Sequence, residues 1–395
     1  MLLGFKTELK LNNYQRTQLA KHVGTARHAY NWGLGLCLGI LEHNRVHPEK
    51  KIKFPTAIDL HKWLVAIVKP ENSWYYSVSK CAPQYALKAL REGFAKWFSK
   101  KGGRPKFKKK GRDDSFTLDG TIKVLEQRKI QLPVIGILQT YEKLPIGHCP
   151  KNITISRQAD RWFISWRIEV STYVKEKNMD VVGVDLGVKS LATLSTGEVV
   201  NGSKSYRKYR QKLARLQRRL SRKVKHSSNW YSAVIDVAKL HRKIANLRGD
   251  TLHKLTTYLS KNHATVVIED LNVSGMLANH KLAASVADMG FYEFRRQLEY
   301  KCKLNGSSLI IADRFFASSK TCSNCGHIKQ ELSLSERVFV CEQVRCQIDR
   351  DLNAAINLSR LSSNRFTPVN RVPPTVLDEA GSRPDHVMSN FVQVL

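Results

Sequence analysis

The stretch ATVVIEDLN at 264–272 constrains the fold of this chain more than any other segment. Its apolar and β-branched residues follow one another without alternation, and two acidic residues come directly after them. Such an unbroken apolar run is typical of a strand buried on both faces of a parallel sheet. The segment therefore predicts a buried parallel strand that ends in carboxylates.

Neighbouring segments supply the other elements of an α/β domain. The segment 180–200, DVVGVDLGVKSLATLSTGEVV, predicts a strand, a glycine-containing turn and a second strand. The segment 306–319, GSSLIIADRFFASS, predicts a further strand. Helices are predicted over 204–223 and about 229–260, and a closing helix over 351–361.

The helix predicted over 204–223 has one apolar face in a very basic sequence, because ten of its twenty residues are Lys or Arg. The apolar stripe consists of Tyr206, Tyr209, Leu213, Leu216 and Leu220. A stripe with alternating steps of three and four is a packing seam. The partner stripe in the next helix consists of Trp230, Val234, Val237, Ile244 and Leu247. The basic outer face can then lie along phosphates.

The first half of the chain follows a different pattern. Residues 2–10 predict a strand, a helical pattern begins at Asn12, and a second helix is predicted over 83–99. From 115 to 172 the apolar residues recur with a period of two, most clearly in RWFISWRIEV at 161–170. We expect a small β-barrel or sheet there.

The charge of the chain points to a polyanionic partner. Lys and Arg number 66 against 33 acidic residues, a net charge of +33, and nucleic acid is the partner that such an excess favours. Two segments are especially basic, 99–112 and 204–225. The candidate contacts to nucleic acid are Lys100, Lys101, Arg104, Lys106, Lys108, Lys109, Lys110, Arg207, Arg210, Arg218 and Arg222.

Hydropathy predicts a protein of the cytoplasm, associated with the nucleoid, without membrane contact. No run of 18 or more apolar residues occurs, and polar residues come too early at the N-terminus for a secretory signal. In that compartment the eight cysteines are expected to be reduced thiols or metal ligands.

Three acidic residues are candidates for a metal-dependent active site. Asp185 lies within the first strand of the predicted hairpin, Glu269 ends the buried strand, and Asp351 begins the last helix. A carboxylate among buried apolar residues is costly unless it is paired or binds a cation, and oxygen ligands suit Mg²⁺ or Mn²⁺. Two such ions would support phosphodiester cleavage. The order of elements and the basic charge favour an RNase H-like nuclease.

Each acid also fits a purely structural role. Asp185 could be a turn residue, and Glu269 with Asp270 could cap the next element. Asp349 and Asp351 could be acids of the first helical turn, favoured by the helix dipole.

Four cysteines lie shortly before the third acid. Cys322 and Cys325 have the C-x2-C spacing of a zinc ribbon, whereas Cys341 and Cys346 have C-x4-C spacing. Both spacings lie within the range of zinc ligands. The fourth ligand stays open between Cys346 and His327, and a degraded site that no longer holds zinc is the alternative.

Four sequence blocks carry a family resemblance. GVDLGVKSLATLSTG, VVIEDLNVSGM, FFASSKTCSNCG and IDRDLNAAINL resemble, in order and spacing, the signature blocks of TnpB proteins. These are transposon-encoded, RNA-guided DNA endonucleases, also called OrfB transposases, related to type V CRISPR effectors. The resemblance covers about 2–358.

The resemblance implies a multidomain α+β fold with assigned residue roles. It implies a wedge β-barrel with an inserted helical recognition domain, and then a RuvC-like α/β nuclease domain with a zinc-ribbon insert. By position, Asp185, Glu269 and Asp351 match the three RuvC acids, and Asp270 and Asp349 rank lower.

The domain boundaries expected on this basis cover the whole chain. They are 1–10 and 100–175 for the wedge, 11–99 for a recognition domain with a helix-turn-helix-like start, 178–314 and 347–360 for the nuclease, 315–346 for the ribbon, and 361–395 for a Pro- and Ser-rich flexible tail.

The second cysteine pair departs from the family pattern of Cys-x-x-Cys-Gly. Val344 stands where the family has cysteine and Arg345 where it has glycine, while Cys346 lies two residues further on. The glycine is expected to adopt a left-handed backbone conformation, which costs a residue with a side chain roughly 1 kcal/mol or more.

The leading hypothesis is an RNA-guided, metal-dependent DNA endonuclease whose partners are a guide RNA and double-stranded target DNA, with no small-molecule substrate. The guide RNA is implied by the resemblance alone and not by the residues themselves. Two alternatives stay open, a nuclease-impaired RNA-guided repressor and a strand-transfer transposase with an RNase H fold. The presence of all three acids argues against a nuclease-impaired repressor. A cysteine ribbon just before the third acid fits a strand-transfer transposase less well than it fits a TnpB protein.

Overall fold

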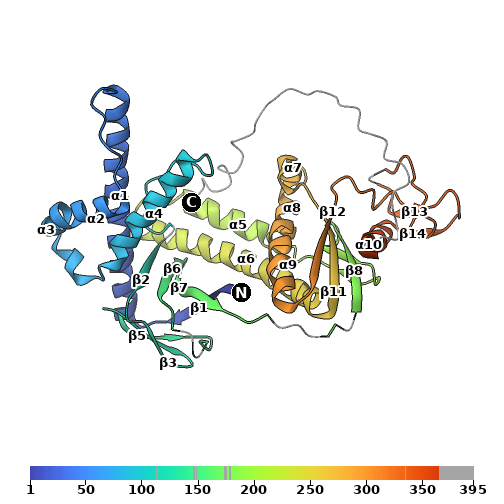
Figure 1. The fold of residues 1–395 in the computed structure, drawn as a ribbon, viewed down its shortest axis with the longest axis horizontal. Coiled ribbons are helices and arrows are strands. Elements are labelled where there is room, and N and C mark those ends of the chain that lie inside the picture. Colours follow the sequence, from blue (N-terminus) through green and yellow to red (C-terminus); the bar gives the residue numbers. More distant parts are fainter. Residues whose placement is uncertain are drawn as a thin grey trace. The chain divides into compact units, whose positions relative to one another are not determined.

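The computed structural model describes residues 1–363, except 113, 146, 148, 173–175, 178 and 334. The chain divides into two compact units, Met1–Val170 and Ser171–Leu395 (Figure 1). Each unit combines helices with a β-sheet, and the predicted α+β class with more than one domain is confirmed. Of the expected flexible tail, 364–395 lie outside the described residues.

The helices of the N-terminal unit precede most of its strands. They are α1 (Asn13–Val46), α2 (Ala57–Trp63), the π-helix η1 (Leu64–Val68), α3 (Lys69–Glu71), the 3-10 helix η2 (Ser73–Ser77) and α4 (Cys81–Phe98). The strands are β1 (Leu2–Lys10), β2 (Ser115–Asp119), β3 (Lys123–Glu126), β4 (Lys129–Leu132), β5 (Gly136–Thr140), β6 (Asn152–Gln158) and β7 (Arg161–Glu169).

Helix α1 is one uninterrupted helix of 34 residues, where a helix-turn-helix-like start was expected. It begins with a capping box, in which Asn12 Oδ1 accepts from the Gln15 amide at 2.8 Å and Gln15 Oε1 accepts from the Asn12 amide at 3.0 Å. Gly33 lets α4 approach, because a Cβ there would lie 2.7 Å from a methyl carbon of Leu87. Leu87, Leu90 and Phe94 are completely buried, so the helix predicted over 83–99 is confirmed.

The sheet of this unit has seven strands in the order β2-β6-β7-β1-β5-β4-β3. β1 pairs with β7 from Leu2 to Glu8 and with β5 at Leu9 and Lys10, so it joins the two halves of the sheet. Trp162, Ile164 and Trp166 of β7 are buried, as period-two alternation requires. Within the described residues β2 and β3 remain as two edges. The closed barrel that was expected is therefore not found, and the sheet is open.

The second unit contains the remaining elements. Its strands are β8 (Met179–Leu186), β9 (Ala192–Leu194), β10 (Val199–Val200), β11 (His263–Glu269), β12 (Ser308–Ala312), β13 (Val338–Val340) and β14 (Gln347–Asp349). Its helices are α5 (Ser205–Ser221), α6 (Ser228–Asn262), α7 (Val273–Ala278), α8 (Ala283–Met289), α9 (Phe291–Asn305), α10 (Arg350–Arg360) and the 3-10 helix η3 (Leu361–Ser363).

The main sheet of this unit has the order β10-β9-β8-β11-β12. β8 and β12 both pair parallel to β11, and β8 forms an antiparallel hairpin with β9, as the sequence predicted. Val182 and Val184 of β8 belong to the core that includes residues of α6 and α9, whereas Val181 lies in the core with Leu358 of α10. Helices therefore cover both faces of the sheet, α9 on one and α10 on the other (Figure 1).

Helices α5 and α6 pack through the predicted seam. Leu213 of α5 is buried against Val237, Leu240 and Ile244 of α6. Leu247, which was expected in the seam, is 39% exposed, so this part of the prediction is wrong. The seam ends before that turn because the 35-residue α6 extends well beyond the 17-residue α5.

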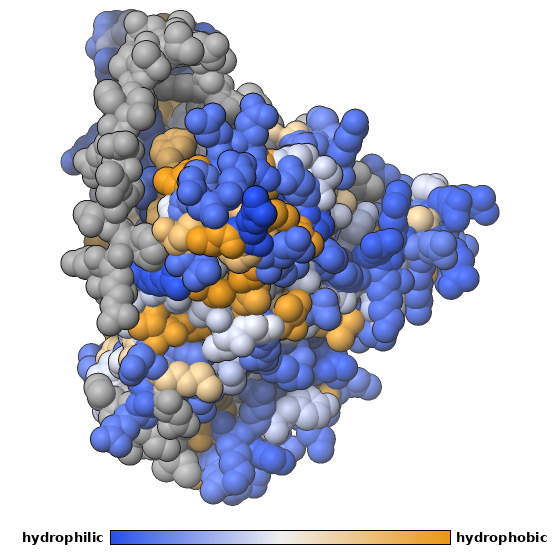
Figure 2. Space-filling view, turned by 90° about the vertical axis from the view of Figure 1, so that its right-hand side faces the viewer, coloured by the Kyte–Doolittle hydropathy of each residue, from blue (hydrophilic) through white to orange (hydrophobic). Residues whose placement is uncertain are grey.

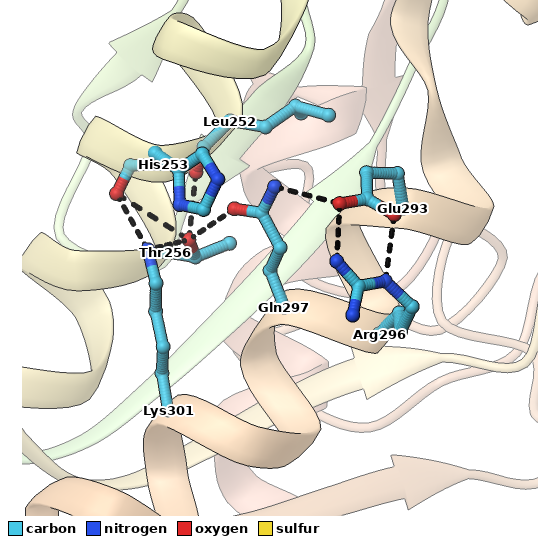
Figure 3. A network of polar contacts seen from close by, with 7 residues as sticks. All are labelled: Leu252, His253, Thr256, Glu293, Arg296, Gln297 and Lys301. Carbon is cyan, nitrogen blue, oxygen red and sulfur yellow. Dashed lines mark hydrogen bonds and ion pairs between the residues drawn. The ribbon is translucent and has the colours of Figure 1, made fainter. Parts of the chain in front are cut away.

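A buried polar network joins α6 to α9 (Figure 3). The Lys301 ammonium donates to the His253 carbonyl at 2.8 Å and to the hydroxyls of Thr256 and Thr257 at 2.7 Å each. Thr256 also donates to Gln297 at 3.0 Å. Burial lowers the pKa of Lys301 to about 8. All three ammonium protons have partners, so we assign this lysine a structural role.

The outer surface matches the composition. Hydrophilic residues predominate on the face in Figure 2, and the apolar areas form smaller patches among them. Among the described helices, none has both the length and the apolar character to cross a membrane.

Gly183 of β8 sets the distance between the sheet and α10. A Cβ on this residue would overlap the Ala355 carbonyl oxygen and lie 2.5 Å from the Ser359 nitrogen. Both of these are backbone atoms of α10, which cannot rotate away as a side-chain end could. A glycine at 183 therefore allows α10 to pack directly on β8.

Gly183→Ala is expected to lower the free energy of unfolding by roughly 2 kcal/mol, within the range of overpacked cores. Gly249→Ala is the matched control, because the added Cβ has no atom within 4 Å and α6 gains from alanine. Thermal unfolding of the full chain measures both. Equal melting temperatures for the Gly183 variant and the unaltered protein would contradict the close approach.

Candidate functional site

Two of the predicted acids lie on the same face of the central sheet. Asp185 follows Val181 and Gly183 at steps of two along β8, and Glu269 follows Val267 by two along β11. Val181 and Val267 belong to the core that α10 covers. Since side chains alternate between faces along a strand, both carboxylates point to the α10 side of two paired parallel strands.

Helix α10 brings the third acid to this face. Asp351 is in its first turn, and Asp349 is its N-cap. Asp349 Oδ1 accepts from the amides of Asp351 and Leu352, both at 3.0 Å. Asp349 therefore caps the helix, and the ranking of Asp351 above it stays a prediction.

The pKa of Asp185 depends on the charges of the other two acids. Burial, and to a smaller extent the charges of Glu269 and Asp351, together raise the pKa of Asp185 from 3.8 to about 8. Burial also raises the pKa of Glu269. Arg350 opposes both shifts without cancelling them. The arrangement is a partly buried cluster of negative charge, which a cation would stabilise.

A serine that the sequence analysis did not single out orients Glu269. The Ser318 hydroxyl donates to Glu269 Oε1 at 2.5 Å, which lowers the pKa of the glutamate against the larger effect of burial. Ser318 is buried, and it lies after β12 in the segment that leads to the first cysteine pair.

Two asparagines of α10 were also missed. Asn353 is fully buried, with its Nδ2 donating to the Thr321 carbonyl at 2.7 Å and its Oδ1 accepting from the Ser323 amide at 2.8 Å. Asn357 donates to the carbonyls of Ser318 and Thr321, at 2.8 and 2.6 Å. The signal was present as two Asn residues four positions apart in an otherwise apolar helix face.

Asp270 has a separate role from its neighbour Glu269. It accepts from Arg295 at 2.7 Å and from Arg314 at 2.6 Å. The hydrogen bond from Arg314 is the largest of the effects that lower the pKa of Asp270. The structure thus pairs Asp270 with arginines, whereas Glu269 faces the other acids.

Three of the four cysteines form one cluster, and the fourth, Cys346, lies beside Cys322. Cys322 Sγ lies 3.6 Å from Cys346 Sγ, and Cys325 Sγ lies 3.5 Å from Cys341 Sγ. The sulfur atoms of Cys322, Cys325 and Cys341 all lie within 4.8 Å of one another. His327 instead points Nε2 toward the Glu342 carboxylate at 3.7 Å.

The two cysteine loops have the same backbone plan. Cys322 N donates to the His327 carbonyl at 2.8 Å, and Cys341 N donates to the Cys346 carbonyl at 3.0 Å, so in each loop the hydrogen bond joins residues five positions apart. Gly326 has φ +79°, and Arg345, which takes the corresponding place in the second loop, has φ +47°. The left-handed turn is retained although an arginine occupies it.

The predicted nucleic-acid contacts are mostly exposed. In the segment after α4, Lys108 is the exception, because its ammonium lies over the Tyr30 ring at 4.4 Å and its backbone is bonded to Asn31. The exposed residues are Lys100, Lys101, Arg104, Lys106, Lys109 and Lys110, then Arg207, Arg210 and Arg218 on α5, and Arg222 at its C-cap. The exposure of these cations does not by itself identify the partner that they bind.

Three family models match the chain. A family described as "Probable transposase" (OrfB_IS605) matches residues 163–280, a "Cas12f1-like, TNB domain" matches 291–358, and a "Helix-turn-helix domain" of the OrfB type matches 1–45.

Relatives extend the similarity over almost the whole chain. The "Putative RNA-guided DNA endonuclease InsQ" of Escherichia coli (strain K12) is 35% identical over 376 residues, 90% of this chain and 91% of that protein. A relative of Streptomyces pristinaespiralis, also named a "Putative RNA-guided DNA endonuclease", is 38% identical over 73% of each chain. The CRISPR-associated endodeoxyribonuclease Cas12f1 of Sulfoacidibacillus thermotolerans is 24% identical over about half of each.

Among solved structures, the mini-RNA-guided endonuclease CRISPR-Cas_phi3 superposes with a TM-score of 0.47 at 9% identity over 92% of each chain, too distant to carry an argument. The sequence relatives are sufficient to assign the family. With 35% identity to InsQ over nine tenths of both chains, this chain belongs to the OrfB/TnpB family, and the resemblance drawn from its sequence blocks is confirmed.

Proposed function

We propose that this chain is an RNA-guided, divalent-metal-dependent DNA endonuclease with Asp185, Glu269 and Asp351 as its catalytic acids. One observation carries the proposal: Asp185 and Glu269 lie on the sheet face that α10 covers, Asp351 lies in the first turn of α10, and burial together with the charges of Glu269 and Asp351 raises the pKa of Asp185 to about 8. The names of its relatives support the activity, and they do not favour a strand-transfer enzyme or an inactive repressor.

The donor set fits Mg²⁺ or Mn²⁺. All three proposed ligands are carboxylates, and hard divalent cations prefer oxygen. A group that resists ionisation because of neighbouring negative charge ionises readily when a cation binds. When bound, the ions supply activation of the attacking water and stabilisation of the leaving oxygen of the phosphodiester.

The other residues of the site hold this arrangement. Ser318 fixes one oxygen of Glu269 and leaves the second oxygen for a cation. Asp349 caps α10, so Asp351 begins the helix in a defined orientation. Arg350 moderates the negative charge near Asp185 and Glu269. Asp185 comes from the rigid interior of the sheet, where movement would break strand pairing.

The proposed partners are a guide RNA and double-stranded target DNA. Guide pairing would recognise the target sequence, while the protein contacts the backbones through its basic side chains. The exposed cations of 99–112 and α5 are the candidates for these contacts. We keep the five expected domain assignments as part of this proposal, together with action in the cytoplasm, at the nucleoid.

We assign a zinc ion to Cys322, Cys325, Cys341 and Cys346. Tetrahedral zinc with Zn–S bonds of ~2.3 Å separates its sulfur ligands by ~3.8 Å. The distances of 3.5 and 3.6 Å between paired sulfur atoms fit this geometry. Cys346 then replaces the missing thiolate at Val344, and the strained Arg345 is retained at a cost of roughly 1 kcal/mol.

Asp185→Ala or Asp351→Asn should abolish DNA cleavage and leave the retained RNA in place. Metal ligands act in the transition state, whereas affinity for nucleic acid comes mainly from Lys and Arg. The experiment sequences the RNA that copurifies with the protein and measures cleavage of matching DNA with a randomised flank. Asp349→Asn is the control, because an asparagine can still cap α10. Cleavage by the Asp185 variant at the native rate would refute the site.

The raised pKa of Asp185 has a consequence for stability in the absence of divalent cations. The folded-state pKa of about 8 lies above the ordinary 3.8, so the folded protein holds a proton that the unfolded chain releases. Stability from this group is present below the ordinary value and is lost as pH rises through 8. Asp185→Asn should therefore unfold at a higher temperature than the native chain at pH 8–9 and show a smaller difference at pH 4.

Added Mn²⁺ should reverse this order, since only the native site gains a charged ligand for the cation. The measurement is thermal unfolding from pH 4 to pH 9, in buffers with and without the ion. If the curves of the two proteins remained parallel over the whole pH range, the proposed burial of Asp185 would be wrong.

Cys346→Ser should reduce the zinc content well below one ion per chain and lower the unfolding temperature, because a structural ligand is lost. His327→Ala is the matched control and should keep its zinc. Elemental analysis and thermal unfolding give the two readouts. Zinc loss in the histidine variant with retention in the serine variant would transfer the fourth position to His327.

A further inference from the structure

Two adjacent phenylalanines after β12 have opposite environments. Phe316 packs on the core formed by Val267, Ala312 and Leu358. Phe315 is 91% exposed. Both residues lie in a tight turn that begins at Asp313. In this turn the Phe315 amide donates to Asp313 Oδ1 at 2.9 Å, and the Phe316 amide donates to the Asp313 carbonyl at 3.0 Å. The turn thus anchors one ring and presents the other to solvent.

An exposed phenylalanine by itself requires no explanation. The surroundings of Phe315 distinguish it. Arg314, directly before it, donates to Asp270, the residue that follows Glu269. Ser318, three residues after it, donates to Glu269 itself. Hydrogen bonds on both sides therefore tie the turn that carries Phe315 to the end of β11, where the proposed catalytic glutamate lies.

The charges in this turn are suited to a nucleic-acid strand. The Arg314 side chain is 49% exposed and held in place by its ion pair with Asp270, which also holds Arg295. An ordered guanidinium beside an exposed ring offers a phosphate contact and a stacking surface on neighbouring residues. Proteins that bind single strands combine these two features, because every base has a flat face and every linkage a negative charge.

We infer that Phe315 is a base-stacking residue that positions a nucleotide of the DNA strand being cut at the Asp185–Glu269–Asp351 site. The inference rests on the proposed nuclease function. DNA is chosen over guide RNA because the turn is bonded to residues of the proposed cleavage centre, which must admit the strand that is cleaved. The nucleotide has to be unpaired, since only an unstacked base exposes a face to the ring.

The test compares Phe315→Leu, which keeps an apolar side chain but removes the ring, with Phe315→Tyr, which keeps the ring. Tyr292→Leu is the matched control, because Tyr292 is a 72% exposed aromatic of the same unit outside the turn. All variants are prepared as the full chain with its retained RNA. Since both rings are exposed, unfolding temperatures should match the unaltered protein, which confirms folding.

Two readouts are measured. The first is cleavage of DNA matching the sequenced guide, at subsaturating and saturating DNA. Loss of one stacked base should lower the rate at subsaturating DNA roughly 5- to 100-fold for Phe315→Leu, with Phe315→Tyr and Tyr292→Leu within about 2-fold of the native rate. The second is the fluorescence of 2-aminopurine placed in the DNA at positions next to the mapped cut, in the inactive Asp185→Ala background.

Stacking should quench 2-aminopurine at one position, and Phe315→Leu but not Phe315→Tyr should restore its fluorescence. Native cleavage and quenching by Phe315→Leu would overturn the inference while leaving the nuclease function intact. Quenching that is unchanged by the variant, with 2-aminopurine in the retained RNA responding instead, would also overturn it. If the unaltered chain neither retains RNA nor cuts DNA, the proposed function fails and the inference fails with it.

Discussion

The close contact between β8 and α10 is the constraint on which the rest of the second unit depends. Gly183 has no side chain, so the helix backbone lies directly against the strand. Asp185 is two residues further along that strand, and Asp351 is in the first turn of that helix. A larger residue at 183 would separate the two elements and, with them, two of the three acids. The packing of α10 on β8 and the relative positions of Asp185 and Asp351 therefore depend on the same contact.

The asparagines of α10 extend this constraint to the ribbon. Asn353 and Asn357 bind backbone atoms between Ser318 and Ser323, and Ser318 holds Glu269. The first cysteine pair begins in this same segment. Order in the ribbon and order at Glu269 are thus mechanically linked, which gives a physical reason for a cysteine ribbon beside a cluster of carboxylates. In this arrangement a bound zinc ion would brace the site without taking part in the reaction.

The charge distribution separates binding from chemistry. A net charge of +33 favours association with any polyanion, and most of the candidate cations are exposed. The carboxylates at the α10 face act in the opposite sense, because their repulsion raises the pKa of Asp185 and lowers stability near neutral pH. Selection for stability alone would not retain three acids at this place. The instability is consistent with a site built for a cation.

Local patterns by themselves determined much of this protein. The unbroken apolar run of β11, the β8–β9 hairpin and helices α4 to α6 follow from periodicity, because side-chain burial repeats along each element independently of its neighbours. The family followed from four short blocks. The sequence did not determine whether the sheet of the first unit closes, which depends on pairing between its edge strands β2 and β3. Nor did it show that Leu247 lies beyond the seam, since this depends on where α5 ends.

Only the tertiary structure shows the different surroundings of the neighbouring acids and cysteines. Asp349 and Asp351 are two positions apart in sequence, but Asp349 caps α10, whereas Asp351 lies in its first turn and its charge raises the pKa of Asp185 more than that of Asp349 does. Cys346 and His327 were both candidates for the fourth ligand, and the fold supports the proposal of Cys346, because its sulfur lies 3.6 Å from that of Cys322 while the imidazole lies near Glu342. The roles of Ser318, Asn353 and Phe315 likewise arise from contacts between distant segments. Long-range contacts decide these questions because a residue's chemistry depends on what surrounds it in space, which no local pattern encodes.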